Sequence, residues 1–364
     1  MEMTKIGIIG VGNIFPAYIK HLRPYRFIEV VACADIRMES AEARAQEYGI
    51  QALSVDALLA QPDIDIVINL TIPSVHAEVS LQIIRAGKYV YSEKPLATTV
   101  EDAQEILEAA KTANVRIGCA PDTFLGGGLQ TCRKIIEDGW IGSPIGATAC
   151  IASHGMEHWH PNPHFFYQPG AGPIFDMGPY YITALFQLLG SIKQVAAMTR
   201  ISFPERTITS EPLYGQKIPV NVATNNVGAF EFSSGVIASV LMSFDIWKHS
   251  LPCIEIYGSR GTLSVPDPNT FGGTIKLWLD SQKEWREVPL AYSSEVGRGI
   301  GVADMAYSIQ QGIPHRASGE VAFHVLEVMQ AFQQSFDESS FIAINSQPRK
   351  PSLLPLGLSL GEIG

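Results

Sequence analysis

The sequence predicts two domains, an α/β domain of the Rossmann type with a parallel sheet and then an α+β domain. At about 100–200 residues per domain, the 364 residues are enough for two. Between residues 5 and 119, short apolar runs alternate with segments of helical period, which is typical of βαβ units. After residue 121, short strands follow one another and the helices are grouped apart. We therefore expect domains at residues 1–122 and 123–364.

The first domain is expected to hold five buried strands, because its apolar runs are short, continuous and rich in β-branched side chains. They lie at residues 6–9, 30–34, 66–70, 89–91 and 115–119. Residues 100–113 have apolar side chains at helical spacing, and Thr98 and Glu101 before them have the spacing of a capping box.

The second domain begins with helix-like segments and continues as a series of short strands. A hairpin is expected at residues 227–232 and 236–244, since Ser233, Ser234 and Gly235 form a turn sequence between two apolar strands. Further strands are predicted at residues 253–257, 261–265, 274–279 and 285–288, and helices at 129–138, 177–189 and 322–336. This order favours an α+β fold.

Composition excludes several classes of protein. Hydrophobic residues make up 46% of the chain and charged residues 17%, which is unlike a disordered protein. The formal charge of −10 disfavours nucleic acid and anionic membranes as partners. The five cysteines lack CxxC spacing, so we expect reduced thiols and a cytoplasmic protein. No signal peptide or membrane-length apolar run is apparent in the sequence.

A glycine-rich turn follows the first predicted strand and predicts dinucleotide binding. Gly10 and Gly12 match the first two glycines of GxGxxG, and Asn13 and Ile14 continue the turn into a helix. The first glycine permits the tight turn, and the second lets the backbone approach the pyrophosphate. Phe15 stands at the third glycine position, so helix and strand must pack differently there.

An acidic residue at the end of the second strand indicates which dinucleotide binds. Asp35 can accept hydrogen bonds from both hydroxyls of the adenosine ribose and would repel a 2′-phosphate, which favours NAD over NADP. Arg37 is a candidate cofactor contact as well, and its guanidinium could hold a phosphate instead.

Two segments of the first domain resemble the Gfo/Idh/MocA oxidoreductase family. They are residues 71–76 and residues 86–97, which include Glu93-Lys94-Pro95. Residues 176–178 and 256–262 add to the resemblance, which extends from Lys5 to about Ile342. It implies a Rossmann domain, then a domain with a large, open, mostly antiparallel sheet through which members commonly form dimers or tetramers. It also implies hydride transfer between NAD(P) and a sugar, polyol or related hydroxy or keto compound.

The resemblance assigns roles to residues at the ends of the predicted strands. Thr71, Pro73, His76 and Glu93 would lie near the ribose and nicotinamide of the cofactor. Lys94 would lie beside both nicotinamide and substrate as the catalytic residue. The chemistry is reasonable, because alcohol oxidation requires that a proton leave with the hydride. A lysine close to the cationic nicotinamide has its ammonium form disfavoured and can exchange that proton.

A second family motif is only partly matched. Asp176 and Gly178 agree with Asp-x-Gly-x-His, but Tyr180 replaces the histidine, and Thr183 replaces an aspartate that usually follows. Tyr180 retains a hydroxyl that can bond the reacting oxygen, although it does not titrate near neutral pH as imidazole does. We therefore expect Lys94 to exchange the proton, with Asp176 and Tyr180 orienting the oxygen.

Residues 154–167 contain four histidines and are predicted to face the substrate. Trp159 and Phe166 could stack on the apolar face of a sugar, and His160, Asn162 and His164 could bond its hydroxyls. An ordered loop at the domain junction is the alternative. No metal is expected, since the spacing matches no HExxH or Cys/His pattern.

Two other functions agree with the same motifs. A hydrolase or lyase could hold NAD and oxidise a sugar transiently while cleaving a glycosidic bond, with no net NADH. A regulator could bind NAD without catalysis, which the missing histidine permits and the retained Lys94 opposes.

Overall fold

The computed structural model describes residues 2–364, which form two compact units. Unit 1 holds the chain up to Gln130 together with Leu290–Leu326 and Pro351–Gly364. Unit 2 holds Thr131–Pro289 and Glu327–Lys350. The division therefore differs from a single boundary after residue 122, because two C-terminal segments belong to unit 1.

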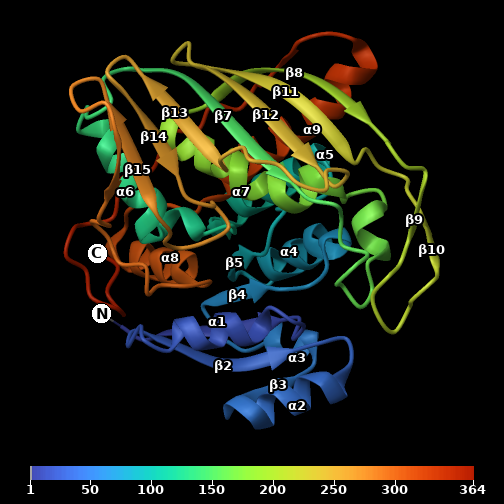
Figure 1. Cartoon of the computed structure of the whole chain (residues 1–364). Helices are drawn as coiled ribbons and strands as arrows, with labels where there is room; N and C mark the ends of the chain where they lie inside the picture. Colours follow the sequence, from blue (N-terminus) through green and yellow to red (C-terminus); the bar gives the residue numbers. More distant parts are fainter. Residues whose placement is uncertain (1) are drawn as a thin grey trace. The chain divides into compact units, whose positions relative to one another are not determined.

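Unit 1 is built on a parallel sheet, as the sequence predicts, but the sheet has six strands and not five (Figure 1). The strand order is β3-β2-β1-β4-β5-β6, so the order reverses between β1 and β4, where Rossmann folds bind their ligands. Five strands occur where they were expected. The sixth, β3, has three residues, none of them fully buried, and therefore lacks the apolar run of the others. The strands are β1 (Thr4–Ile9), β2 (Ile28–Ala34), β3 (Gln51–Leu53), β4 (Ile66–Asn69), β5 (Tyr89–Ser92) and β6 (Ile117–Cys119).

Helices connect the strands of unit 1. The predicted helix at residues 100–113 is α5 (Val100–Ala113), but its cap is Thr99, which accepts a hydrogen bond from the Asp102 amide, and not Thr98. The others are α1 (Phe15–Leu22), α2 (Met38–Tyr48), α3 (Val55–Leu59), η1 (Pro73–Val75), α4 (His76–Arg85), η2 (Thr123–Leu125) and α8 (Ile300–Gln311).

A buried carboxylate is one of several groups that join the C-terminal segment of unit 1 to its sheet, together with the Cys119 amide, which donates to the Ala317 carbonyl oxygen. Asp122, shortly after β6, accepts hydrogen bonds from the amides of Gly299 (2.7 Å) and Gly301 (3.0 Å) at the start of α8. A carboxylate at a helix N-terminus is electrostatically favourable. Burial nevertheless raises the pKa of Asp122 above its usual value.

Unit 2 contains a nine-stranded sheet in which only β7 and β12 pair in parallel. The predicted hairpin is present as β11 and β12, and the four later strands were also predicted. In sheet order the strands are β16 (Trp285–Val288), β15 (Ile275–Leu279), β14 (Gly261–Val265), β13 (Ile254–Gly258), β7 (Pro144–Ala152), β12 (Ile237–Ser243), β11 (Asn225–Phe232), β8 (Ile192–Arg200) and β17 (Ile342–Ala343).

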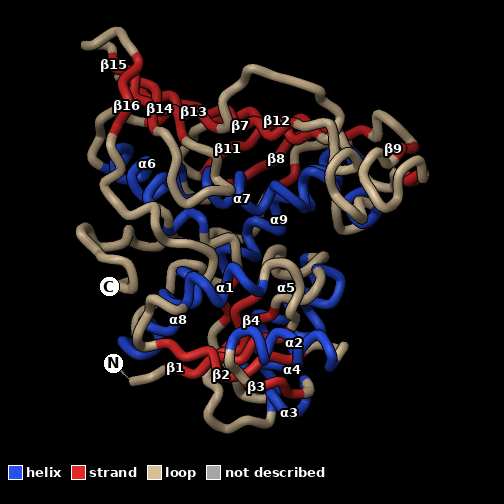
Figure 2. Tube along the Cα trace, turned by 60° about the horizontal axis from the view of Figure 1, so that its bottom comes forward, coloured by secondary structure: helices blue, strands red, loops and turns tan. Residues whose placement is uncertain are grey.

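Helices cover one face of this sheet and leave the other open (Figure 2). They are α6 (Gly127–Glu137), α7 (Gly172–Leu189) and α9 (Gly319–Glu338). Phe230 of β11 packs edge-on against Phe332 of α9, with ring centroids 5.6 Å apart. The alternate residues point the other way, and Met198, Val227 and Ile237 are 77%, 53% and 61% exposed. The open sheet expected from the family resemblance is therefore confirmed.

A separate two-stranded hairpin, β9 (Glu205–Thr207) with β10 (Lys217–Pro219), lies between β8 and β11 in the sequence. It was not predicted, because each strand has only three residues. No helix among residues 2–364 is both long enough and apolar enough to cross a membrane.

Candidate functional site

The turn after β1 has the geometry that a dinucleotide pyrophosphate requires. Gly10 has φ +94°, and a Cβ there would lie 2.6 Å from the Leu70 carbonyl oxygen, so only glycine fits. A Cβ on Gly12 would meet nothing within 4 Å, so there is open space beside the backbone. No side chain caps α1, and its first turn carries no acidic residue, so the positive end of the helix dipole is not offset locally.

The departure at the third glycine position has a packing explanation. Phe15 is fully buried, and its ring lies edge-on to Tyr48 of α2, with centroids 5.7 Å apart. The aromatic side chain thus fills the space between α1 and α2, and the turn of Gly10 and Gly12 keeps its shape.

Asp35 lies immediately after β2, beside the glycine turn. Its Oδ2 accepts a hydrogen bond from the Val11 amide (3.1 Å), and its Oδ1 accepts one from the Arg37 amide (3.0 Å). The carboxylate is therefore fixed, with lone pairs left for ribose hydroxyls. Arg37 is exposed.

Two exposed isoleucines follow the strands on either side of β1. Ile36 follows β2 and is 97% exposed, and Ile72 follows β4 and is 66% exposed. Large apolar side chains at the carboxyl ends of these strands suit an adenine ring. Sequence reasoning overlooked both residues, although an apolar side chain directly after Asp35 was a usable signal.

The Glu93 carboxylate accepts two hydrogen bonds, one of them from the backbone of Lys94. Its Oε1 accepts a hydrogen bond from the Tyr18 hydroxyl (2.9 Å), and its Oε2 accepts one from the Lys94 amide (3.0 Å). Burial, with the nearby Glu93 charge, raises the pKa of Tyr18 well above its usual value, so the phenol stays protonated and donates. Lys94 itself is partly exposed. Tyr18 was not predicted, because nothing in the sequence links two residues 75 positions apart.

His76 is buried between two stretches of backbone. It is fully buried, with Nδ1 2.7 Å from the Pro95 carbonyl oxygen and Nε2 3.0 Å from that of Thr71. Burial lowers the pKa of His76 below its usual value. Both ring nitrogens face the backbone. His76 joins the segment after β4 to that after β5, and Pro73 is exposed in η1.

The residues of the second family motif lie on α7 of unit 2. Asp176 and Tyr180 are four positions apart and so share one face of the helix. Asp176 is partly exposed, and Tyr180 is 5% exposed. Pro179 lies between them inside the helix and cannot donate a backbone hydrogen bond.

The histidine-rich segment mixes exposed and buried side chains. Trp159 is 58% exposed, Asn162 is exposed, and His160 and His164 are partly exposed. Phe166 is buried in a hydrophobic cluster, which corrects the prediction that it stacks on a sugar. The neighbouring Phe165 is 52% exposed. The other members of the cluster are Tyr167, Ile208, Ile218, Val220 and Phe244.

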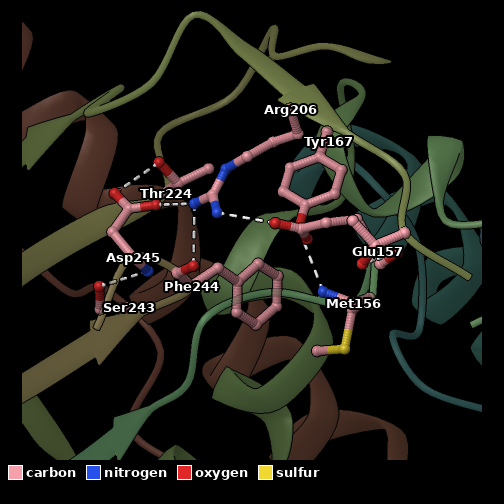
Figure 3. A network of polar contacts seen from close by, with 9 residues as sticks. Met156, Glu157, Tyr167, Arg206, Thr224, Ser243, Phe244 and Asp245 are labelled. Atoms are coloured by element: carbon pink, nitrogen blue, oxygen red, sulfur yellow. Dashed lines mark hydrogen bonds and ion pairs between the residues drawn. The ribbon is translucent and has the colours of Figure 1, made fainter. Parts of the chain in front are cut away.

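A buried polar network anchors this segment to the β9–β10 hairpin (Figure 3). The Arg206 guanidinium pairs with Glu157 (2.9 Å) and with Asp245. Tyr167 donates its hydroxyl hydrogen bond to Glu157, and Thr224 donates to Asp245 (2.8 Å). Sequence reasoning missed Arg206, whose only signal is a charged residue at the inward position of a very short strand.

Among residues 2–364, no three His, Cys, Asp or Glu side chains lie together in a group able to hold a metal ion. All five cysteines are free thiols.

Comparison with known proteins places both parts of the chain in one family. A family model described as an oxidoreductase family with an NAD-binding Rossmann fold matches residues 4–120. A model described as the GFO/IDH/MocA C-terminal domain matches residues 129–264.

Curated relatives and solved structures extend this similarity along the chain. 1,5-Anhydro-D-fructose reductase of Ensifer adhaerens is 30% identical over 263 residues, which cover 72% of this chain and 75% of that protein. Inositol 2-dehydrogenase 3 of Saccharopolyspora erythraea is 29% identical over 295 residues, which cover 78% and 80%. The structure of levoglucosan dehydrogenase with NADH and L-sorbose superposes with a TM-score of 0.81 at 21% identity, covering 94% of this chain and 99% of that one, so the fold is shared.

Proposed function

The chain belongs to the Gfo/Idh/MocA family of NAD(P)-dependent oxidoreductases, and from this premise we propose which residues perform its reaction and on what substrate. The substrate we propose is a sugar, polyol or related small hydroxy or keto compound. The names of the curated relatives, a reductase of an anhydro sugar and a dehydrogenase of inositol, support this class.

We propose that NAD binds at the carboxyl ends of β1, β2 and β4. The observation that carries this proposal is the pair of glycines, one of which excludes any Cβ while the other leaves open space for phosphate. Asn13 and Ile14 would present backbone amides to the pyrophosphate, and Asp35 would accept bonds from both ribose hydroxyls. NADP is disfavoured because its 2′-phosphate would meet the Asp35 carboxylate. The adenine would lie between Ile36 and Ile72.

Bound NAD supplies the acceptor or donor of hydride, and the protein must manage the proton. We propose that Lys94 takes the proton from the substrate hydroxyl during oxidation and returns it during reduction. The Glu93 carboxylate holds the Lys94 amide and thereby fixes the backbone of the catalytic residue. Thr71 and Pro73, whose turn is tied by His76 to Pro95, would border the ribose and nicotinamide.

Unit 2 is proposed to supply the substrate contacts. Asp176 and Tyr180 would orient the reacting oxygen, with the Tyr180 hydroxyl in place of the family's imidazole. Trp159 would stack on the apolar face of the sugar, and His160, Asn162 and His164 would bond its hydroxyls. The buried Phe166 is left out of this set, and the exposed Phe165 takes its place.

The two alternatives are not favoured, since the two curated relatives are named as a reductase and a dehydrogenase. We also propose a homo-oligomer assembled through the open sheet face, on which Met198, Val227 and Ile237 are exposed. Free thiols support a cytoplasmic location, and the charge of −10 argues against a nucleic-acid partner.

The test is a spectrophotometric screen of NAD and NADP reduction over polyols, aldoses, sugar acids and inositols, repeated with Lys94→Met. We expect NADH to form with at least one compound and Lys94→Met to lower kcat by about 10²–10⁴-fold, the usual contribution of a proton-transfer residue. NADH affinity should change little. Lys111→Met, on the exposed surface of α5, is the control. Normal turnover by Lys94→Met would refute the assignment.

A further inference from the structure

The histidine-rich segment has little structure of its own to hold it in place. Its only regular element is η3 (His164–Tyr167), a single short turn, and the segment contains two prolines. A loop that must present side chains to a ligand needs external support, because side-chain recognition tolerates only small displacements. The support therefore has to come from neighbouring elements of unit 2.

The β9–β10 hairpin and the residues that follow β9 supply this support through the backbone. The Glu157 carbonyl oxygen accepts hydrogen bonds from the amides of Thr209 (2.8 Å) and Ser210 (3.1 Å). The Ser210 hydroxyl donates to the His160 carbonyl oxygen (2.6 Å). The Tyr167 carbonyl oxygen accepts from the Asn221 amide (2.9 Å). The segment is thus hydrogen-bonded to residues 209–221 near its start, near its end and beside Trp159.

Arg206 is the centre of this support. Its side chain is 4% exposed, and the side chains of its partners Glu157 and Asp245 are 8% and 6% exposed. Its Nη2 also donates to the Phe244 carbonyl oxygen (2.9 Å), and the Phe203 ring lies 4.8 Å from the guanidinium carbon. One guanidinium therefore connects three separate stretches of chain, as Figure 3 shows.

The charge balance of the network explains why both hydroxyl donors are present. One guanidinium faces two buried carboxylates, so the ions alone leave one negative charge in excess. The Tyr167 and Thr224 hydroxyls each donate to one carboxylate and offset part of that excess. Burial and the bond to Glu157 raise the pKa of Tyr167, which keeps it a donor. Buried ion groups of this kind add little net stability compared with apolar packing, but they define one geometry.

We propose that Arg206 is a positioning residue for substrate recognition, which acts by fixing Glu157 and the β9–β10 hairpin so that Trp159 and His160 are held in one orientation. The inference rests on the proposed role of the histidine-rich segment in binding a sugar. Arg206 itself does not touch the substrate. Its side-chain hydrogen bonds and its contacts with the Tyr167 and Phe203 rings lie within unit 2.

The experiment uses one strong and one mild variant of the full-length protein. Arg206→Met removes the centre of the network and risks misfolding, because two buried carboxylates lose their counter-ion. Ser210→Ala removes only the hydroxyl that bonds the His160 carbonyl. Ser335→Ala is the matched control. Like the Ser210 hydroxyl, the Ser335 hydroxyl donates to a backbone carbonyl oxygen at 2.6 Å, here that of Ser340. It lies elsewhere in unit 2 and in addition accepts a hydrogen bond from the Ala197 amide.

Two readouts are measured: amide hydrogen exchange across residues 154–167, and steady-state kinetics with NAD and whichever of D-xylose, myo-inositol and levoglucosan the wild type oxidises. Ser210→Ala should speed exchange in the segment and raise KM for the sugar about fivefold, the effect of one lost hydrogen bond. Its kcat and its NADH affinity should stay near wild type. Ser335→Ala should change none of these quantities, although it should lower the melting temperature at least as much as Ser210→Ala does.

The outcomes separate the two proposals. If Ser210→Ala and Ser335→Ala behave alike in both readouts, the residues that follow β9 do not position the segment for the substrate, and the role proposed for Arg206, which acts by fixing this region, is refuted. If exchange in the segment rises but the sugar KM does not, the network holds a loop that does not recognise substrate, and this inference fails while Lys94 chemistry stands. If the wild type oxidises no sugar or polyol at all, the proposed function fails. The hold of the network on the segment can still be tested in that case, and unchanged amide hydrogen exchange in Arg206→Met and Ser210→Ala would refute it.

Discussion

The two glycines of the turn after β1 should respond in opposite ways to the same added methyl group. Gly12→Ala places a Cβ where no atom lies within 4 Å, and Gly12 has no positive φ. The folded protein should therefore accept it, with a change in unfolding free energy within about 1 kcal/mol. Gly10→Ala places a Cβ 2.6 Å from the Leu70 carbonyl oxygen in a residue with φ +94°.

The cost of Gly10→Ala can be worked out from these two features. A left-handed backbone at a residue with a Cβ costs about 1–2 kcal/mol. The clash is with backbone atoms at the end of β4 and cannot be relieved by rotating a side chain, so the total should reach about 2–4 kcal/mol. Gly12→Ala should instead lose NADH affinity about 10- to 100-fold, because its methyl occupies the approach of a phosphate that would lose charge-assisted bonds.

The assays are urea unfolding followed by far-UV circular dichroism, and calorimetric titration with NADH. The expected pattern is a stable Gly12→Ala that binds NADH weakly and a Gly10→Ala that is destabilised. If Gly12→Ala bound NADH as the wild type does, the space beside Gly12 would not be the phosphate site. If both variants were equally destabilised, the contrast between a crowded Gly10 and an open Gly12 would be wrong.

Three further predictions test other contacts of unit 1. Asp35→Asn should weaken NADH binding and strengthen NADPH binding, about tenfold each, because it removes a carboxylate that favours ribose hydroxyls and repels phosphate. The control is Asp65→Asn, since the Asp65 carboxylate also accepts a hydrogen bond from a backbone amide, at the start of β1. An unchanged ratio of NADH affinity to NADPH affinity in Asp35→Asn would contradict the ribose role. Burial lowers the pKa of His76 below the usual histidine value of about 6.5, so the unfolded chain binds a proton that the folded protein does not, and stability should fall as pH drops below about 6.5, at up to about 1.36 kcal/mol per pH unit. His76→Gln should flatten that slope in urea unfolding between about pH 7.5 and pH 5, and an unaltered slope would argue against a neutral buried imidazole. Tyr18→Phe should lower the unfolding free energy by about 1.5–3 kcal/mol, since Glu93 loses a buried donor, and a neutral effect would show that this bond contributes nothing.

The parallel sheet of unit 1 could be predicted because both of its faces are covered, which leaves continuous apolar runs in the sequence. The bounds of the helix at residues 100–113 were predicted correctly, since its apolar stripe is a local feature, but its cap was placed one residue too early, at Thr98 instead of Thr99. The strands β3, β9, β10 and β17 were missed because two or three residues carry no measurable period, and the nine-residue strands β7 and β8 were not predicted either. Helix α8 was missed, and its contact with Asp122 joins residues that are 177 positions apart in the sequence.

Sequence alone located the glycine turn after β1 but could not separate neighbouring side chains with different surroundings. Phe165 and Phe166 are chemically identical, and only the fold shows that one is exposed and the other buried. His76 was identified as important, yet its two backbone contacts depend on segments brought together by the sheet. Arg206 gave no signal at all beyond its place in a very short strand, because its partners lie 49 and 39 positions away.

The transfer of a substrate hydride to NAD at Lys94 is tested most directly with a C-deuterated polyol or sugar from the active panel. Mass spectrometry of the nicotinamide product should show one deuterium per NAD reduced, with one equivalent of keto or lactone product, and Lys94→Met should slow both to the same extent. Cleaved sugar without deuterated NADH, or an equal rate in Lys94→Met, would contradict the account.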